Sequence, residues 1–224
     1  GGGRVPAENI PWCAILRCKA AWACWIGHTV YSWNFYTLLT QLPSYLSLLL
    51  HLSPDEAGWI MSLAYLLMLA TSIFAGILAD KILANNVMSS TAVRKCAEVI
   101  SVFVPSLLLW GASQVEDETR GLSLLITAIA CMGFCSAGHH TNYLEISTSL
   151  SGILMGIGNT VTCISGIAGP IVTGALVDYY HCNQDNPTNC RTAYGKVNLV
   201  GICLCSTGTL FFICCASSKR VLDY

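Results

Sequence analysis

The sequence predicts an all-α membrane protein with six transmembrane helices. Of the 224 residues, 54% are hydrophobic and 10% are charged, and the mean hydropathy is +0.60. A soluble globular domain carries roughly 25% charged residues. Here the charged residues divide the chain into six apolar stretches, each close to the length of about 20 residues that a helix needs to cross a bilayer. None of them alternates strictly between apolar and polar residues, so helices are favoured over barrel strands.

The six expected helices cover residues 20–42, 57–79, 96–112, 122–138, 153–177 and 197–217. We expect residues 1–19 to form a cytoplasmic linker, residues 20–217 one transmembrane domain, and residues 218–224 a cytoplasmic tail. The orientation follows from the basic residues, because Lys and Arg are retained on the cytoplasmic side. With both ends inside, that side holds Arg4, Arg17, Lys19, Lys81, Arg94, Lys95, Lys219 and Arg220 of the 11 basic residues.

Charge also narrows the choice of partners. The formal net charge is −1, and the chain has no basic helix with interleaved aromatic residues. A nucleic-acid partner is therefore not expected, whereas the lipid bilayer is.

The first expected helix combines apolar length with many polar groups. At 100° per residue, His28, Tyr31, Phe35 and Tyr36 fall on one face of it. A polar face on a spanning helix points either at other helices or at a water-filled cavity. The sequence leaves two interpretations open, a substrate surface or a seam of hydrogen bonds between helices.

Most of the 13 cysteines lie in apolar stretches, where Cys packs as a small hydrophobic residue. Cys182 and Cys190 differ, because their loop is predicted to face an oxidising compartment. A disulfide between them and two free thiols are equally compatible with the sequence. No CxxC pair is present and His181 stands alone in its loop, so no metal site is expected.

Three motifs carry a resemblance to a known family. They are "WNFYTLLTQLPSY" at residues 33–45, "SSTAVRK" at residues 89–95 and "TNYLEISTSLSGILMGIGNT" at residues 141–160. In this order they resemble the anion transporters of the major facilitator superfamily, a group that includes sialin, the vesicular glutamate transporters and the sodium–phosphate cotransporters.

The resemblance implies that the six helices are helices seven to twelve, the C-terminal half of a twelve-helix fold. The chain would then be a fragment whose partner is a missing N-terminal six-helix half. The implied function is secondary active transport of small organic or inorganic anions, sialin-like, by alternating access, in a lysosomal, vesicular or plasma membrane. We expect no enzyme activity and no cofactor, with H⁺ or Na⁺ as the coupling ion.

The residues expected to line the substrate cavity are His28, Tyr31, Phe35, Tyr36 and Asn159. Asn159 matches an Asn of the family's motif. Tyr31 stands where the vesicular glutamate transporters carry an Arg, which makes glutamate a less favoured substrate. No Arg or Lys lies inside the expected spans, so the positive charge that an anion needs is expected from the missing half.

A second group of residues suggests a gate on the cytoplasmic side. The resemblance implies that Asp80 pairs with Arg94 or Lys95 in one conformation and releases it in the other; an ordinary surface ion pair is the alternative. For Glu98 we expect an ion pair with Arg94 four residues earlier, with proton coupling as the less favoured role. His139 and His140 form either a pH-sensitive pair or part of a solvated loop.

The sequence also departs from the family pattern. Glu145 replaces the family's Asp, and Tyr143 replaces its His. The Pro that usually follows the family's Asp-Ile element is missing from "ISTSLS". These departures suggest a divergent paralogue or an imperfect gene model. A sodium-dependent phosphate carrier and a non-transporting structural membrane partner stay open as alternatives. An intramembrane serine protease is disfavoured, because "CISG" at residues 163–166 lacks the first Gly of the serine motif and no His follows in the last stretch.

Overall fold

The computed structural model describes residues 10–222, which contain helices and connections and no β-strand. The elements are α1 (Trp12–Arg17), α2 (Lys19–Leu49), α3 (Pro54–Ala84), α4 (Ser90–Glu98), the π-helical turn η2 (Val99–Phe103), α5 (Val104–Gln114), α6 (Glu118–Met132), the 3-10 turn η3 (Gly133–Ser136), α7 (His139–Ile146), α8 (Ser151–Tyr179) and α9 (Pro187–Cys215). The predicted all-α class is confirmed. Residues 1–9 of the expected linker and residues 223–224 of the expected tail lie outside this description.

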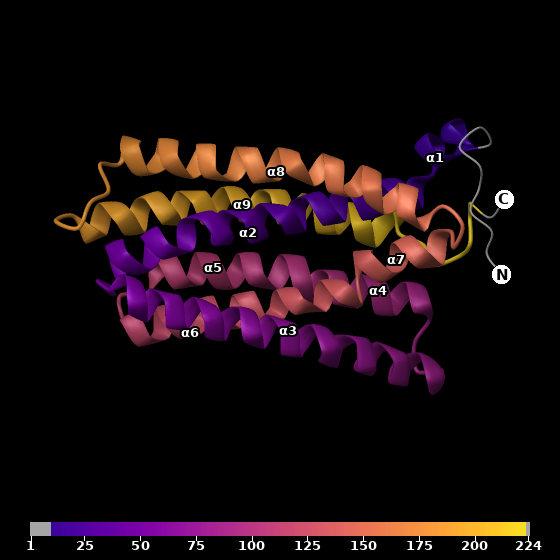
Figure 1. Cartoon of the computed structure of the whole chain (residues 1–224), viewed down its shortest axis with the longest axis horizontal. Coiled ribbons are helices and arrows are strands. Elements are labelled where there is room, and N and C mark those ends of the chain that lie inside the picture. The colour runs from indigo at the N-terminus through magenta and orange to yellow at the C-terminus, as the bar shows by residue number, and fades with distance from the viewer. Residues whose placement is uncertain (1–9, 223–224) are drawn as a thin grey trace.

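The long helices form a bundle of roughly parallel rods (Figure 1). Since η2 joins α4 to α5, and η3 with a short turn joins α6 to α7, each of these groups makes one rod. With α2, α3, α8 and α9, the described chain contains six rods. The predicted linker includes the short helix α1, which lies at the same end of the bundle as α7 and the end of α9 (Figure 1).

Five of the rods are long and apolar enough to cross a membrane: Pro54–Ala84, Ser90–Gln114, Glu118–Ile146, Ser151–Tyr179 and Pro187–Cys215. The remaining rod, α2, is as long as α3 at 31 residues. It falls short on hydropathy because residues such as His28, Asn34 and Gln41 interrupt its apolar character. The chain is an integral, multi-pass membrane protein.

The helices extend beyond the predicted apolar stretches, because caps rather than hydropathy set their ends. Ser53 begins α3 with a capping box completed by Glu56, and the Asp117 side chain accepts a hydrogen bond from the Arg120 amide at the start of α6. Helix α9 begins at Pro187 rather than at residue 197. Its early charged residues end the apolar stretch but are fully compatible with a helix.

Helix α2 lies inside the bundle, packed against α8 and α9 and also touching α7 and α3. Glycines on its neighbours permit the close approach. A Cβ at Gly208 of α9 would lie 2.6 Å from both methyl carbons of Val30, and one at Gly169 of α8 would lie 2.6 Å from Thr37 Oγ1. The Cβ positions of Gly152 and Gly156 of α8, which are spaced as in the GxxxG packing motif, have no atom within 4 Å among the described residues.

Helices α3 and α8 leave broad apolar faces uncovered. Trp59, Leu66 and Ile73 of α3 are 79%, 62% and 59% exposed, and Ile164 and Ile167 of α8 are 64% and 65% exposed. Such faces are stable only in contact with lipid or with further protein. By contrast, the side of α2 that faces the interior of the bundle is covered by the other rods.

Candidate functional site

The expected cavity residues of α2 lie at different depths. His28 and Tyr31 are buried, while Phe35 and Tyr36 are half-buried. The Tyr31 and Phe35 rings are stacked with centroids 6.1 Å apart, and the Phe35 and Tyr36 rings meet edge to face at 5.5 Å. Phe35 also contacts Tyr65 of α3 at 6.4 Å. These rings form a continuous aromatic row, which we call the α2 aromatic row: Tyr31, Phe35, Tyr36 and Tyr65.

Some of the polar groups of α2 bond to other helices. Asn34 Nδ2 donates to the Val102 carbonyl at 3.4 Å, and Ser165 Oγ of α8 donates to the Thr29 carbonyl at 2.8 Å. Interhelical bonding therefore accounts for part of the polarity of this helix. It does not account for the aromatic row, whose Tyr36 ring rests against Gly166 of α8.

Asn159 is placed apart from the other expected cavity residues. Its side chain is exposed on α8 and makes no hydrogen bond within residues 10–222, while its carbonyl accepts from Thr162 Oγ1 and Cys163 Sγ. The structure thus brings together His28, Tyr31, Phe35 and Tyr36, and leaves Asn159 on an open face.

A buried polar cluster, which the sequence did not predict, lies where α2 meets α7. The rings of His28 and His139 are stacked with centroids 4.9 Å apart, and His140 lies 5.1 Å from His28 and 4.5 Å from His139. Tyr31 adjoins the cluster, with its ring 5.3 Å from that of His139. We call His28, His139 and His140 the histidine cluster.

Glu98 of α4 contacts His139 of this cluster through its carboxyl group. It is fully buried, and its Oε2 lies 2.8 Å from His139 Nδ1 and accepts the His139 backbone amide at 3.2 Å. The predicted ion pair of Glu98 with Arg94 is wrong, because Glu98 turns inward toward α7. The sequence signal for the cluster was the pair His139–His140, which helix α7 draws into the bundle instead of a solvated loop.

Arg94 instead forms an ion pair with Glu145 of α7. Its Nε and Nη2 donate to the two carboxylate oxygens at 3.0 and 2.8 Å, and its Nη1 donates to the Ala137 carbonyl at 2.9 Å. Asp80 is exposed near the end of α3, and Lys95 is half-buried. In this conformation neither of them takes part in an ion pair within residues 10–222.

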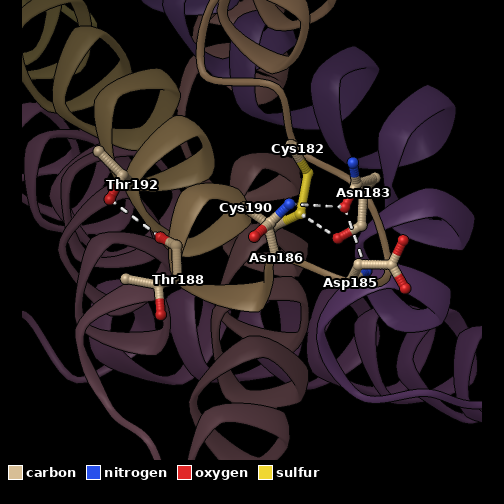
Figure 2. The surroundings of a disulfide bond; sticks show 7 residues. All are labelled: Cys182, Asn183, Asp185, Asn186, Thr188, Cys190 and Thr192. Atoms are coloured by element: carbon tan, nitrogen blue, oxygen red, sulfur yellow. Dashed lines mark hydrogen bonds between the residues drawn. A yellow bond between two sulfur atoms is a disulfide. The ribbon is translucent and has the colours of Figure 1, made fainter.

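The loop between α8 and α9 contains a disulfide between Cys182 and Cys190, one of the two states that the sequence left open (Figure 2). Asn183 organises the loop beside it: its Oδ1 accepts from the Asp185 amide at 3.1 Å and from Asn186 Nδ2 at 3.2 Å. The bridge closes the turn that reverses the chain from α8 into α9.

Comparison with known proteins places this architecture in a family. Residues 24–213 match the model of the Major Facilitator Superfamily. Human sialin is 35% identical over 170 residues, covering 75% of this chain and 34% of its own length. The chloroplastic ascorbate transporter of Arabidopsis thaliana is 27% identical over 98% of this chain and 38% of its own, and a probable vesicular glutamate transporter of Caenorhabditis elegans is 27% identical over 95% and 35%.

A solved structure agrees in fold. A bacterial homologue of the human lysosomal transporter Spinster, in an inward-facing and unoccupied conformation, superposes with a TM-score of 0.64 at 14% identity. The match covers 96% of this chain and 52% of that one. The chain spans about a third of the length of the curated relatives above. These relatives are transporters and not enzymes, and the chain belongs to the Major Facilitator Superfamily, resembling the anion transporters within it.

Proposed function

We propose that this chain is the C-terminal half, helices seven to twelve, of a sialin-like secondary active transporter for small organic anions. In this architecture two six-helix halves rock about a site near the middle of the membrane and expose it alternately to each side. The coupling ion is H⁺ or Na⁺, and the membrane is lysosomal, vesicular or the plasma membrane. The missing N-terminal half is the chain's partner.

The α2 aromatic row carries this proposal. Three of its four rings lie on α2, the helix whose motif resembles the opening of the seventh transporter helix, and the half-buried Tyr36 marks the accessible end of the row. Aromatic rings with a few hydroxyl groups suit the mixed apolar and polar surface of a small organic anion. Asn159 joins the site as a polar group on the open face of α8.

The charges of the described helices support a two-part site. An anion that leaves water needs a compensating positive charge. Arg94, which is buried, is already paired with Glu145, and no other buried Arg or Lys occurs in residues 10–222. We therefore assign the anion's positive partner to the other half of the transporter.

The uncovered apolar faces of α3 and α8 also support a site that is divided between two halves. Among the five apolar rods, α3 and α8 bury the smallest shares of their residues within this chain. The match to 52% of a solved transporter chain is also the size of one half. In the proposal, parts of α3 and α8 face the missing half across the substrate path.

Asp80, Arg94 and Lys95 are proposed as the cytoplasmic gate. Asp80 would pair with one of the two basic residues in a conformation other than the present one, in which Arg94 binds Glu145. Opening and closing this pair would bias the two states of the transporter.

The test is uptake into proteoliposomes by the full-length protein and by the 224-residue chain alone. Sialic acid, phosphate, urate and glutamate are offered with and without a pH or sodium gradient. We expect gradient-driven uptake of an organic anion by the full-length protein and none by this chain. Uptake by the chain alone would refute the assignment as a half, and failure of all four anions with the folded full-length protein would refute the function.

A further inference from the structure

We propose that the histidine cluster binds a divalent transition-metal ion, Zn²⁺ by its ligand chemistry, at the contact between α2 and α7. Imidazole nitrogen is a preferred ligand of zinc, and three imidazoles with one open position are a common zinc set. One nitrogen from each of His28, His139 and His140 lies within 4.8 Å of the others. Side-chain rotations bring such nitrogens to the shorter separations of a bound ion.

Two ring nitrogens of the cluster have no hydrogen-bond partner. His28 Nδ1 and His139 Nε2 are buried and have no hydrogen-bond partner within residues 10–222. His28 is 7% exposed and His139 is fully buried. A buried polar atom without a partner costs about 1 to 3 kcal/mol, so native structures rarely leave one without a reason. A metal ion would bind both nitrogens at once.

Glu98 fixes the orientation that metal binding requires. When His139 Nδ1 carries the proton and donates it to Glu98 Oε2, at 2.8 Å, its Nε2 keeps a free lone pair that can bind a metal. Metal-binding histidines typically use their second nitrogen in this way, with a carboxylate behind the ring. The Glu98 carboxyl group is itself fully buried, and a nearby divalent cation would stabilise its charged form there.

The backbone around the cluster leaves room for this arrangement. A Cβ at Gly27 would contact Glu98 Oε1, and one at Gly138 would lie 2.8 Å from Glu98 Oε2. A Cβ at Gly158 of α8 would contact the Tyr143 hydroxyl and lie 3.3 Å from His28 Nδ1. Glycine at these three positions lets the carboxylate and the imidazoles approach closely.

His140 provides a route for the ion. It is half-buried and lines a pocket of about 380 Å³ together with Ser136, Thr141, Tyr143 and Ser151. A water molecule from this pocket would fill the fourth position on the metal. The site joins His28 of α2 to two residues of α7, so the ion would fasten these two helices together.

Metal binding is measured on the whole chain in detergent, independently of transport. We expect about one Zn²⁺ per chain after dialysis, and a Co²⁺ form with the intense visible absorption of a tetrahedral site. The chain has 11 free cysteines among its described residues. A sulfur-to-cobalt charge-transfer band would therefore place the metal on thiolates and overturn the proposal, as would a weak octahedral spectrum or no binding.

Variants provide a matched comparison within the chain's five histidines. His28→Gln with His140→Gln should abolish stoichiometric zinc binding, whereas His51→Asn with His181→Asn should leave it intact. The control positions are exposed and have φ of 48° and 51°, which Asn tolerates. Equal binding by the two double variants would overturn the proposal. The cobalt spectrum is recorded on the unsubstituted chain, so it tests the proposal even if a variant misfolds.

Glu98→Gln tests the supporting carboxylate. The amide keeps a hydrogen-bond acceptor for His139 but removes the charge. We expect zinc affinity to fall about 10- to 100-fold with the stoichiometry retained. Unchanged affinity would show that Glu98 and His139 merely share a proton and would overturn the metal assignment of this pair.

Discussion

Arg94 and Glu145 form the ion pair that ties the start of the α4 rod to α7. Both guanidinium bonds to the carboxylate are short, and Ser90 Oγ donates a further one to Glu145 Oε1 at 2.6 Å. Removing one partner of such a pair destabilises the fold, because the other charge, here the half-buried Glu145 carboxylate, is left without compensation.

Arg94→Ala should therefore destabilise the bundle by about 3 kcal/mol, and Arg94→Lys by less, because Lys keeps the charge but lacks the two-pronged geometry. Thermal unfolding of the chain in detergent measures the effect. Lys95→Ala is the control, since Lys95 forms no ion pair within the described residues. Equal shifts for the Arg94 and Lys95 substitutions would show that the pair contributes nothing.

At the same scale, the sequence identified Arg94, Glu98, His28 and the two adjacent histidines as notable residues. It could not assign the partners of Arg94, Glu98 and His28, because each of them pairs with a residue of α7, far away in the chain. The expected pair between Glu98 and Arg94 relied on helical spacing alone. That spacing holds within α4, but the inner face of the helix points Glu98 at α7, where His139 lies.

Among the elements, α9 and α8 show how glycine sets the helix packing. Gly208→Ala places a methyl group 2.6 Å from both γ-carbons of Val30, whose branched side chain has little freedom to move. We expect a loss of about 1 to 3 kcal/mol. The equivalent change Gly156→Ala meets no atom within 4 Å and should be neutral or stabilising by up to about 1 kcal/mol.

Thermal unfolding of the two alanine variants, measured side by side, checks this difference. A similar decrease in the unfolding temperature of both variants would mean that the helices are less tightly packed at Gly208 than in the structure. Gly152 and Gly156 of α8 have the GxxxG spacing that favours close helix contact. Motif spacing does not reveal which face of α8 meets α2, and the structure places Gly158, Gly166 and Gly169 there instead.

The helices themselves were largely predictable. Each of the six predicted stretches lies mainly within one rod, because long apolar segments between charges admit few other structures. The ends of the helices were not predictable, because capping side chains and tolerated charges extend the helices past the hydrocarbon core. The turns η2 and η3 left no periodic signal, because each changes only one turn of an otherwise helical segment.

For the whole molecule, the six rods give the bundle two ends with different loops. The Arg191 Nη2 of α9 donates to the Glu116 carbonyl at 3.0 Å, so the α5–α6 and α8–α9 connections lie at one end. The Ser218 amide donates to Thr91 Oγ1 at 3.0 Å, which places the chain after α9 at the other end, beside the start of α4. Figure 1 shows the same arrangement.

Cysteine labelling tests this orientation. In a background with the exposed free cysteines changed to serine, Asn85→Cys and Thr119→Cys are treated with an impermeant maleimide in sealed vesicles whose cytoplasmic face is outward. The basic-residue bias predicts that Asn85→Cys reacts at once and Thr119→Cys only after detergent is added. Reaction of both before detergent would contradict the membrane arrangement of the rods.

The α2 aromatic row leads to the most direct test of the proposed transport path. In the full-length protein, Tyr36→Cys is exposed to an impermeant thiol reagent during turnover, with and without the transported anion, and Leu42→Cys serves as the control. Tyr36 is half-buried on the aromatic row, whereas Leu42 is 1% exposed in the core. We predict that Tyr36→Cys reacts and that the anion slows the reaction, while Leu42→Cys stays unmodified. A Tyr36→Cys protein that remains unreactive from both sides of the membrane throughout turnover would contradict the account.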